Sequence, residues 1–143
     1  STFSRFLADG VFAPYGGMLT MYVNSKAQEH VKQVLEDWLR ERARTIYAER
    51  VDEWYPHFER YGIQRPQVVV RKMKSRWGSC TAKGKITLNF KLIQVPKQLI
   101  DYVIVHEMCH LIEHSHAPAF YALMGKMMPD WEERRDKLNS FEF

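Results

Sequence analysis

One helical segment, from Lys97 to about Glu113, constrains the fold of this chain more than any other part of the sequence. Its apolar residues recur at three- and four-residue steps, which predicts a helix packed against a core. The helix also contains the sequence His106-Glu-Met-Cys-His110, so both imidazoles leave one face about a turn apart. Because buried histidines and a buried carboxylate need partners, the fold must bring polar groups or a metal ion to this face.

The spacing of His106 and His110 is typical of a metal site. Both rings can bind one Zn²⁺ at about 2.0–2.1 Å, and zinc is the ion that we expect for a hydrolytic role. Glu107 is turned about 100° around the helix axis, which places its carboxylate beside the metal. There it can take a proton from a water molecule whose pKa the metal has lowered to about 7. The alternative interpretation is a helix whose histidines are incidental.

A catalytic zinc ion needs a third protein ligand and one open position. His116 lies beyond the expected end of the helix, so that a turn can bring it back to the metal. Geometry favours it over His114, because three histidines in line along one helix do not surround a tetrahedral ion. Acidic residues of a later helix remain open as the third ligand: Asp130, Glu132 and Glu133.

The N-terminal half of the chain is predicted to be one long helix, from Lys26 to about Tyr61, with Ser25 as a candidate N-cap. We expect Pro56 to kink or split this helix and Gly62 to end it. Its apolar residues form a single stripe, and its aromatic residues are expected to fill the core. The stripe consists of Val31, Val34, Leu35, Trp38, Leu39, Ala43 and Ile46, and the aromatic residues are Trp38, Tyr47, Trp54 and Tyr55.

Two strands are predicted after this helix, over residues 67–73 and 85–90, and short helices follow from 119 to 138 with a break at Pro129. Residues 18–23 also have the composition of a strand. The resulting fold class is α+β: a long N-terminal helix, a small antiparallel or mixed sheet, and the histidine-bearing helix followed by short C-terminal helices.

Composition limits the classes of protein to consider. With 143 residues, 45% of them apolar, the chain is expected to form a single domain, residues 1–143, with a helical region at 25–62 and a catalytic core at 63–143. Cys80 and Cys109 are the only two cysteines and are expected to be free thiols, which favours a cytoplasmic location over a disulfide-stabilised secreted fold. No apolar run approaches the roughly 18 residues that span a membrane.

Several motifs together resemble the YgjP-like metallopeptidase family, which is zincin-like and related to SprT-like proteases. They are Ser75-Arg-Trp-Gly-Ser-Cys80, Thr87-Leu-Asn89, Asp101 to His110, and His116 followed by Phe120 and Pro129-Asp130, and the match covers about residues 65–138. The resemblance implies that His106, His110 and His116 bind the metal and that Glu107 is catalytic. Family members are often longer at the N-terminus, so residues 1–24 are a candidate remnant of a larger N-terminal region.

The expected function is therefore that of a zinc metallopeptidase that acts on an unidentified peptide or protein substrate. A second electrophile for the oxyanion is left open among Arg76, Asn89, Tyr102 and Tyr121. One alternative is a zinc-stabilised module that binds nucleic acid or a nucleic-acid-processing partner, which the net charge of +4 permits. Another is hydrolysis of a non-peptide amide by the same zinc centre.

Overall fold

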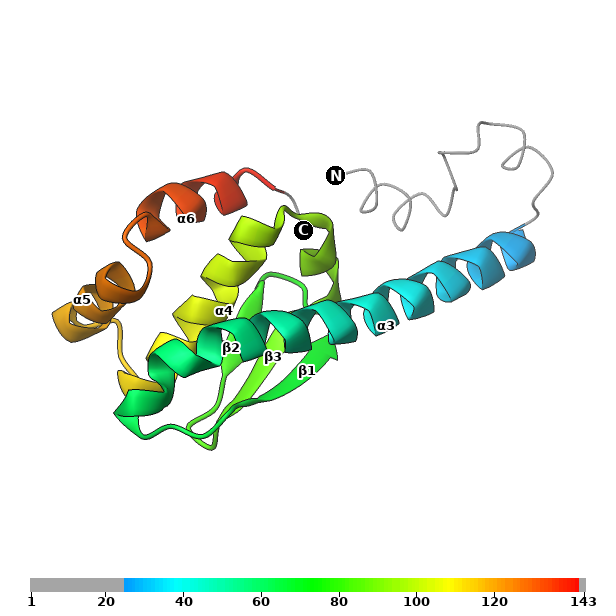
Figure 1. Ribbon diagram of the computed structural model, residues 1–143. Coiled ribbons are helices and arrows are strands. Elements are labelled where there is room, and N and C mark those ends of the chain that lie inside the picture. Colours follow the sequence, from blue (N-terminus) through cyan, green and yellow to red (C-terminus); the bar gives the residue numbers. More distant parts are fainter. Residues whose placement is uncertain (1–24, 142–143) are drawn as a thin grey trace.

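The computed structural model describes residues 25–141, which form the long helix, the sheet and the C-terminal helices shown in Figure 1. Helix α3 (Ser25–Phe58) is continuous through Pro56, so the expected split does not occur. Pro56 lies in the last turn, where only one helical hydrogen bond is lost. The 3₁₀ helix η2 (Glu59–Tyr61) follows, and Gly62 ends it with a left-handed φ of 82°, as expected of a C-terminal glycine.

The predicted burial of the apolar stripe of α3 is confirmed for Leu39 and Ala43 but is wrong for the first residues of the stripe. Val31, Val34 and Trp38 are 38%, 54% and 53% exposed, so the expectation that Trp38 fills the core is also wrong. For Val31 and Val34 the physical reason is visible in Figure 1: the start of the helix extends beyond the sheet and the other helices. Trp38 is exposed although Glu36 and Leu39 on either side of it are buried, so it lies on the solvent side of the helix. Helical periodicity shows which residues share a face, but not how far the core extends along it. The buried apolar residues of α3 are Leu39, Ala43, Tyr47, Val51 and Phe58.

The sheet is mixed and has three strands in the order β1-β3-β2. Strand β1 (Gln67–Arg71) is parallel to β3 (Lys85–Asn89), and β2 (Gly78–Cys80) is antiparallel to β3. After the long helix, the sequence predicts strands only at 67–73 and 85–90, and β2 lies in the connection between them. Three residues that begin with glycine are too few to show alternation, so only pairing with β3 reveals this strand.

Helices α3 and α4 (Lys97–Ile112) cover one face of the sheet, α3 over β1 and α4 over β2, and they also contact each other. The strands bury alternate residues, Ile86 and Leu88 among them, while Thr87 on the other face is partly exposed. Helix α4 therefore lies between the sheet and the C-terminal helices that follow it. This explains why most of its residues are buried, in contrast to α3.

The remaining elements hold α4 in place. The 3₁₀ helix η3 (Phe90–Gln94) leads into it and is capped by Asn89, whose side chain accepts a hydrogen bond from the Lys91 amide. Helices α5 (Pro118–Met127) and α6 (Trp131–Asn139) pack against α4, with the expected break between them. The predicted strand at 18–23 lies outside the described residues. Within residues 25–141, no helix combines the length and the apolar character that crossing a membrane requires.

Candidate metal centre and catalytic site

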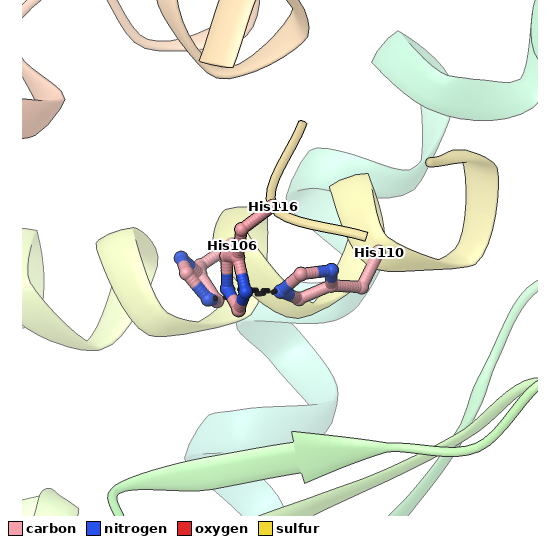
Figure 2. A group of neighbouring side chains, drawn as sticks. All are labelled: His106, His110 and His116. Atoms are coloured by element: carbon pink, nitrogen blue, oxygen red, sulfur yellow. Dashed lines mark hydrogen bonds between the residues drawn. The ribbon is translucent and has the colours of Figure 1, made fainter. Parts of the chain in front are cut away.

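Helix α4 places two imidazoles on one face, as the four-residue spacing predicts. The Nε2 atoms of His106 and His110 lie 3.2 Å apart. Their rings meet edge to face, with centroids separated by 4.8 Å. Figure 2 shows that both rings point to the same side of the helix. The two side chains therefore present their Nε2 atoms to one point.

His116 reaches the same point from the segment between α4 and α5. Its Nε2 atom lies 3.0 Å from Nε2 of His110, and the ligand atoms of the three histidines all lie within 4.8 Å of one another (Figure 2). In the described part of the chain, neither His114 nor the acidic alternatives join this group. His114 lines the same cavity but is exposed, and Asp130 forms an ion pair with Arg134.

The three nitrogens fit a divalent cation. Nδ1 of His110 lies 3.3 Å from the Glu113 carbonyl oxygen, a contact that assigns the single ring proton to Nδ1 and leaves a lone pair on Nε2. That lone pair faces two other Nε2 atoms at 3.2 and 3.0 Å. Nitrogen ligands 2.0–2.1 Å from a tetrahedral ion lie about 3.3 Å apart, close to both distances. Converging lone pairs at this separation are favourable when a cation lies between them.

The ionisation of the site also suits a metal ligand, which must be a neutral imidazole. The pKa of His106 is lowered to about 4, mainly by burial and further by repulsion from a charge on His110 or His116. Burial also lowers the pKa of His110. Both shifts favour the neutral ring, which is the form that binds a metal.

Phe120 of α5 contacts all three histidines and was not identified as a site residue from the sequence. Its ring is fully buried and stacks on His110, with centroids 4.2 Å apart and an angle of 18° between the planes. It meets His106 and His116 edge to face at 5.1 and 5.2 Å. The available signals were its position four residues after His116 and its place in the motif that resembles the family.

Glu107 lies beside the three histidines and is 7% exposed. Burial raises the pKa of its carboxyl to about 7, although a hydrogen bond from Cys80 and the charge of Arg76 act in the opposite direction. The thiol contact brings β2 against the carboxylate, a relation that the sequence did not predict. A buried carboxyl whose pKa lies near neutrality has the property that a general base needs.

The histidines and Glu107 line an open cavity of about 660 Å³ together with strand β2 and Arg76. Of the candidates for a second electrophile, Asn89 is fully buried, and its amide donates to the carbonyl oxygens of Met73 and Arg76. It therefore holds the chain before β2 and does not face the cavity. Arg76 lines the cavity, the Tyr102 ring lies 5.9 Å from that of His106, and the Tyr121 ring lies 6.3 Å from that of His116.

Comparison with known proteins gives one family and two related structures. The family model of the YgjP-like metallopeptidase domain matches residues 15–141 of this sequence. The structure of the metallopeptidase zymogen abylysin of Pyrococcus abyssi is similar, with 26% identity and a TM-score of 0.55 over 63% of this chain and 92% of that one. The metallopeptidase zymogen jannalysin of Methanocaldococcus jannaschii shares the fold at 20% identity, with a TM-score of 0.55 over 66% and 94%. The search of curated proteins found no match.

Proposed function

Because this chain belongs to the YgjP-like metallopeptidase family, we propose that it is a zinc-dependent peptidase in which His106, His110 and His116 bind the ion and Glu107 is the general base. The observation that carries this proposal is the convergence of three Nε2 atoms beside a buried carboxylate at an open cavity. Three imidazoles leave the fourth position of a tetrahedral ion for water or substrate.

The roles of the residues follow from their positions. When bound, the ion supplies Lewis acidity, which polarises a carbonyl and lowers the pKa of water to about 7. Glu107 accepts the proton of the attacking water and then donates it to the leaving amine. Its two tasks need a carboxyl that ionises near neutral pH, which burial provides. Phe120 keeps the three imidazoles in their orientations by contacting each ring.

The peptide is proposed to bind along strand β2. This strand is at an edge of the sheet, because it pairs with β3 on one side, and it lines the cavity with the histidines. An extended peptide can add to such an edge through main-chain hydrogen bonds. The scissile carbonyl would then lie next to both Glu107 and the metal centre.

The nucleic-acid alternative gains no support from the described residues. The sequence contains a run of basic residues, Arg71, Lys72, Lys74 and Arg76, in which Lys72 forms an ion pair with Glu36 at 3.3 Å. Arg76, the last member of the run, lines the cavity of the metal centre. Two of the four basic residues therefore have other neighbours, Glu36 and the metal centre.

The test measures metal content and hydrolysis on the same protein. The chain is purified without added metal, analysed for its elements, and incubated with fluorescent casein and a mixture of unmodified peptides whose products are identified by mass spectrometry. We expect about one equivalent of zinc and cleavage that stops when a chelator removes it. Glu107→Gln is the control for a contaminating protease, since any remaining cleavage would come from another enzyme. Absence of cleavage by zinc-loaded protein would contradict the peptidase proposal, and a panel of small amides would then test the alternative substrate.

A further inference from the structure

The thiol of Cys80 is a group at the cavity to which the proposed function gives no role. Cys80 is the last residue of β2, is partly exposed and lines the cavity with the histidines. Its thiol lies within interaction range of the Glu107 carboxyl, because each of the two groups shifts the pKa of the other. The second cysteine, Cys109, is fully buried in α4 and does not line this cavity. The two thiols therefore have different surroundings, and only that of Cys80 contacts the proposed base.

The contact follows from the way in which β2 packs against α4. A Cβ atom on Gly78 would lie 3.0 Å from Cγ1 of Val103, so only glycine allows the strand to approach the helix this closely. Gly78 and Cys80 point to the same face of the strand, about 6.6 Å apart. Val103 and Glu107 lie on the same face of the helix, about 6 Å apart. Because the two spacings match, the contact of Gly78 with Val103 brings Cys80 to Glu107.

We propose that Cys80 is a positioning residue: its thiol donates a hydrogen bond to one oxygen of the Glu107 carboxylate and leaves the other oxygen to act on water. This inference rests on the proposed function for its catalytic consequence, but not for the hydrogen bond itself. An ionised carboxylate only accepts hydrogen bonds and has room for several, so one donor fixes its orientation without occupying it.

The nature of the donor matters as much as its position. Burial raises the pKa of the Cys80 thiol to about 11, so it keeps its proton at neutral pH. A thiol is a weak, neutral donor, and it holds the carboxylate without cancelling its charge. A lysine or arginine at this place would instead form an ion pair with Glu107 and compete with the water for its oxygens.

Infrared spectroscopy tests the hydrogen bond without any substrate. The S–H stretching band lies where other protein groups do not absorb, and the difference between the wild-type and Cys80→Ala spectra isolates the band of Cys80. We expect a lower frequency than that of an aliphatic thiol in an apolar solvent. In Glu107→Gln the band should move to higher frequency, because a neutral amide oxygen is a weaker acceptor than a carboxylate. A band at the same position in both proteins would overturn the proposal.

Kinetics with zinc-loaded protein and fluorescent casein test the consequence. We expect Cys80→Ala to lower kcat about 10-fold with KM and zinc content unchanged, since a misplaced base affects only the chemical step. Cys80→Ser keeps a donor and should recover kcat to within about 3-fold of the wild type. Cys109→Ala is the matched control, because it removes a thiol that does not contact Glu107.

The two measurements separate this inference from the proposed function. If the wild-type protein cleaves no casein, the peptidase proposal fails while the infrared band still decides whether Cys80 donates to Glu107. If the wild type is active and Cys80→Ala retains its full kcat, the positioning role is overturned and the peptidase proposal stands. A Cys80→Ser variant as slow as Cys80→Ala would likewise contradict the role of the donor.

Discussion

Asp101 and Glu107 are both buried carboxylates of α4, under two helical turns apart, but their surroundings differ. Asp101 is 6% exposed and accepts two hydrogen bonds from Arg50 of α3, Nε to Oδ1 at 2.7 Å and Nη2 to Oδ2 at 3.0 Å. Glu107 is 7% exposed, and within residues 25–141 no cation lies at ion-pair distance from it. The neutral thiol of Cys80 is the group proposed to donate a hydrogen bond to it.

The two carboxylates therefore differ in how their charge is compensated. Asp101 has its charge neutralised by a bidentate guanidinium, an arrangement that fixes α3 against α4. Glu107 keeps a charge that its buried position disfavours, and its pKa rises to about 7. A group that is expensive to ionise and is left without a counter-ion is typical of a functional site. The same helix thus carries a carboxylate that is ion-paired to α3 near one end and, near the other, the carboxylate that is proposed to be the general base.

The largest effect is expected when the metal ion beside Glu107 is removed. We expect His110→Ala to release zinc and to abolish hydrolysis, because His110 is the ring whose Nε2 lies closest to both of the others. Elemental analysis after dialysis measures the first effect, and casein cleavage measures the second. One equivalent of zinc retained in the purified variant would show that the three histidines are not the ligands.

Glu107→Gln removes the charge of the base and keeps its shape. We expect kcat to fall by about 10²–10⁴-fold, the usual contribution of a general base, with zinc still bound. The stability of the metal-free protein should be equal or higher, because a buried carboxylate without a counter-ion is lost. Chemical denaturation measured with and without zinc checks this. Unchanged hydrolysis would refute the assigned mechanism.

Arg50→Ala tests the other end of the helix, where the opposite result is expected. Removing one partner of a buried ion pair leaves Asp101 uncompensated and should lower the free energy of unfolding by about 3–5 kcal/mol. The kcat of the folded fraction and its zinc content should not change. The matched control is the double variant Arg50→Met/Asp101→Leu, which should recover most of the lost stability. A loss for Arg50→Ala as small as that of the double variant would mean that the pair does not hold the two helices.

The sequence predicted α4 and the meeting of His106 with His110 because both depend on helical periodicity, a local property. The contact between Cys80 and Glu107 depends instead on β2, a strand with no pattern of its own that is held by β3 and by close packing of Gly78 on α4. Tertiary contacts of this kind leave no periodic signal in one sequence.

Exposure was the second property that periodicity could not supply. Trp38 was assigned to the helical stripe of Leu39 and Ala43, but it is 53% exposed although Glu36 and Leu39 on either side of it are buried. The sequence also gave no indication that Arg50 is the partner of Asp101, because all three strands lie between these two residues along the chain. Ion pairs between distant elements depend on the packing angle of the helices, which the residue pattern does not determine.

The smallest expected effect concerns pH and the metal-free protein. The folded-state pKa of His106 is about 4 against an ordinary 6.5, so the unfolded chain binds more protons between these values, and stability falls as pH drops from 6.5 towards 4. Glu107 acts in the opposite sense. Its folded-state pKa is about 7 against 4.5, so its contribution to stability falls as pH rises through that range. The two contributions are similar in size, and the wild-type stability should change little between pH 5 and pH 7.

Glu107→Gln removes one side of this balance. The variant should become more stable by about 1–2 kcal/mol from pH 5 to pH 7, because only the histidine contribution remains. Asp101→Asn is the matched control: it removes a carboxylate from the same helix but not from the histidine centre, so its stability should be lower throughout and as flat with pH as that of the wild type. Urea denaturation of chelator-treated proteins at pH 5, 6 and 7 measures all three. If the stability of Glu107→Gln does not change with pH, Glu107 and the histidines do not make opposing contributions to the pH dependence of stability. The two carboxylates of α4 would then not differ in their effect on that pH dependence.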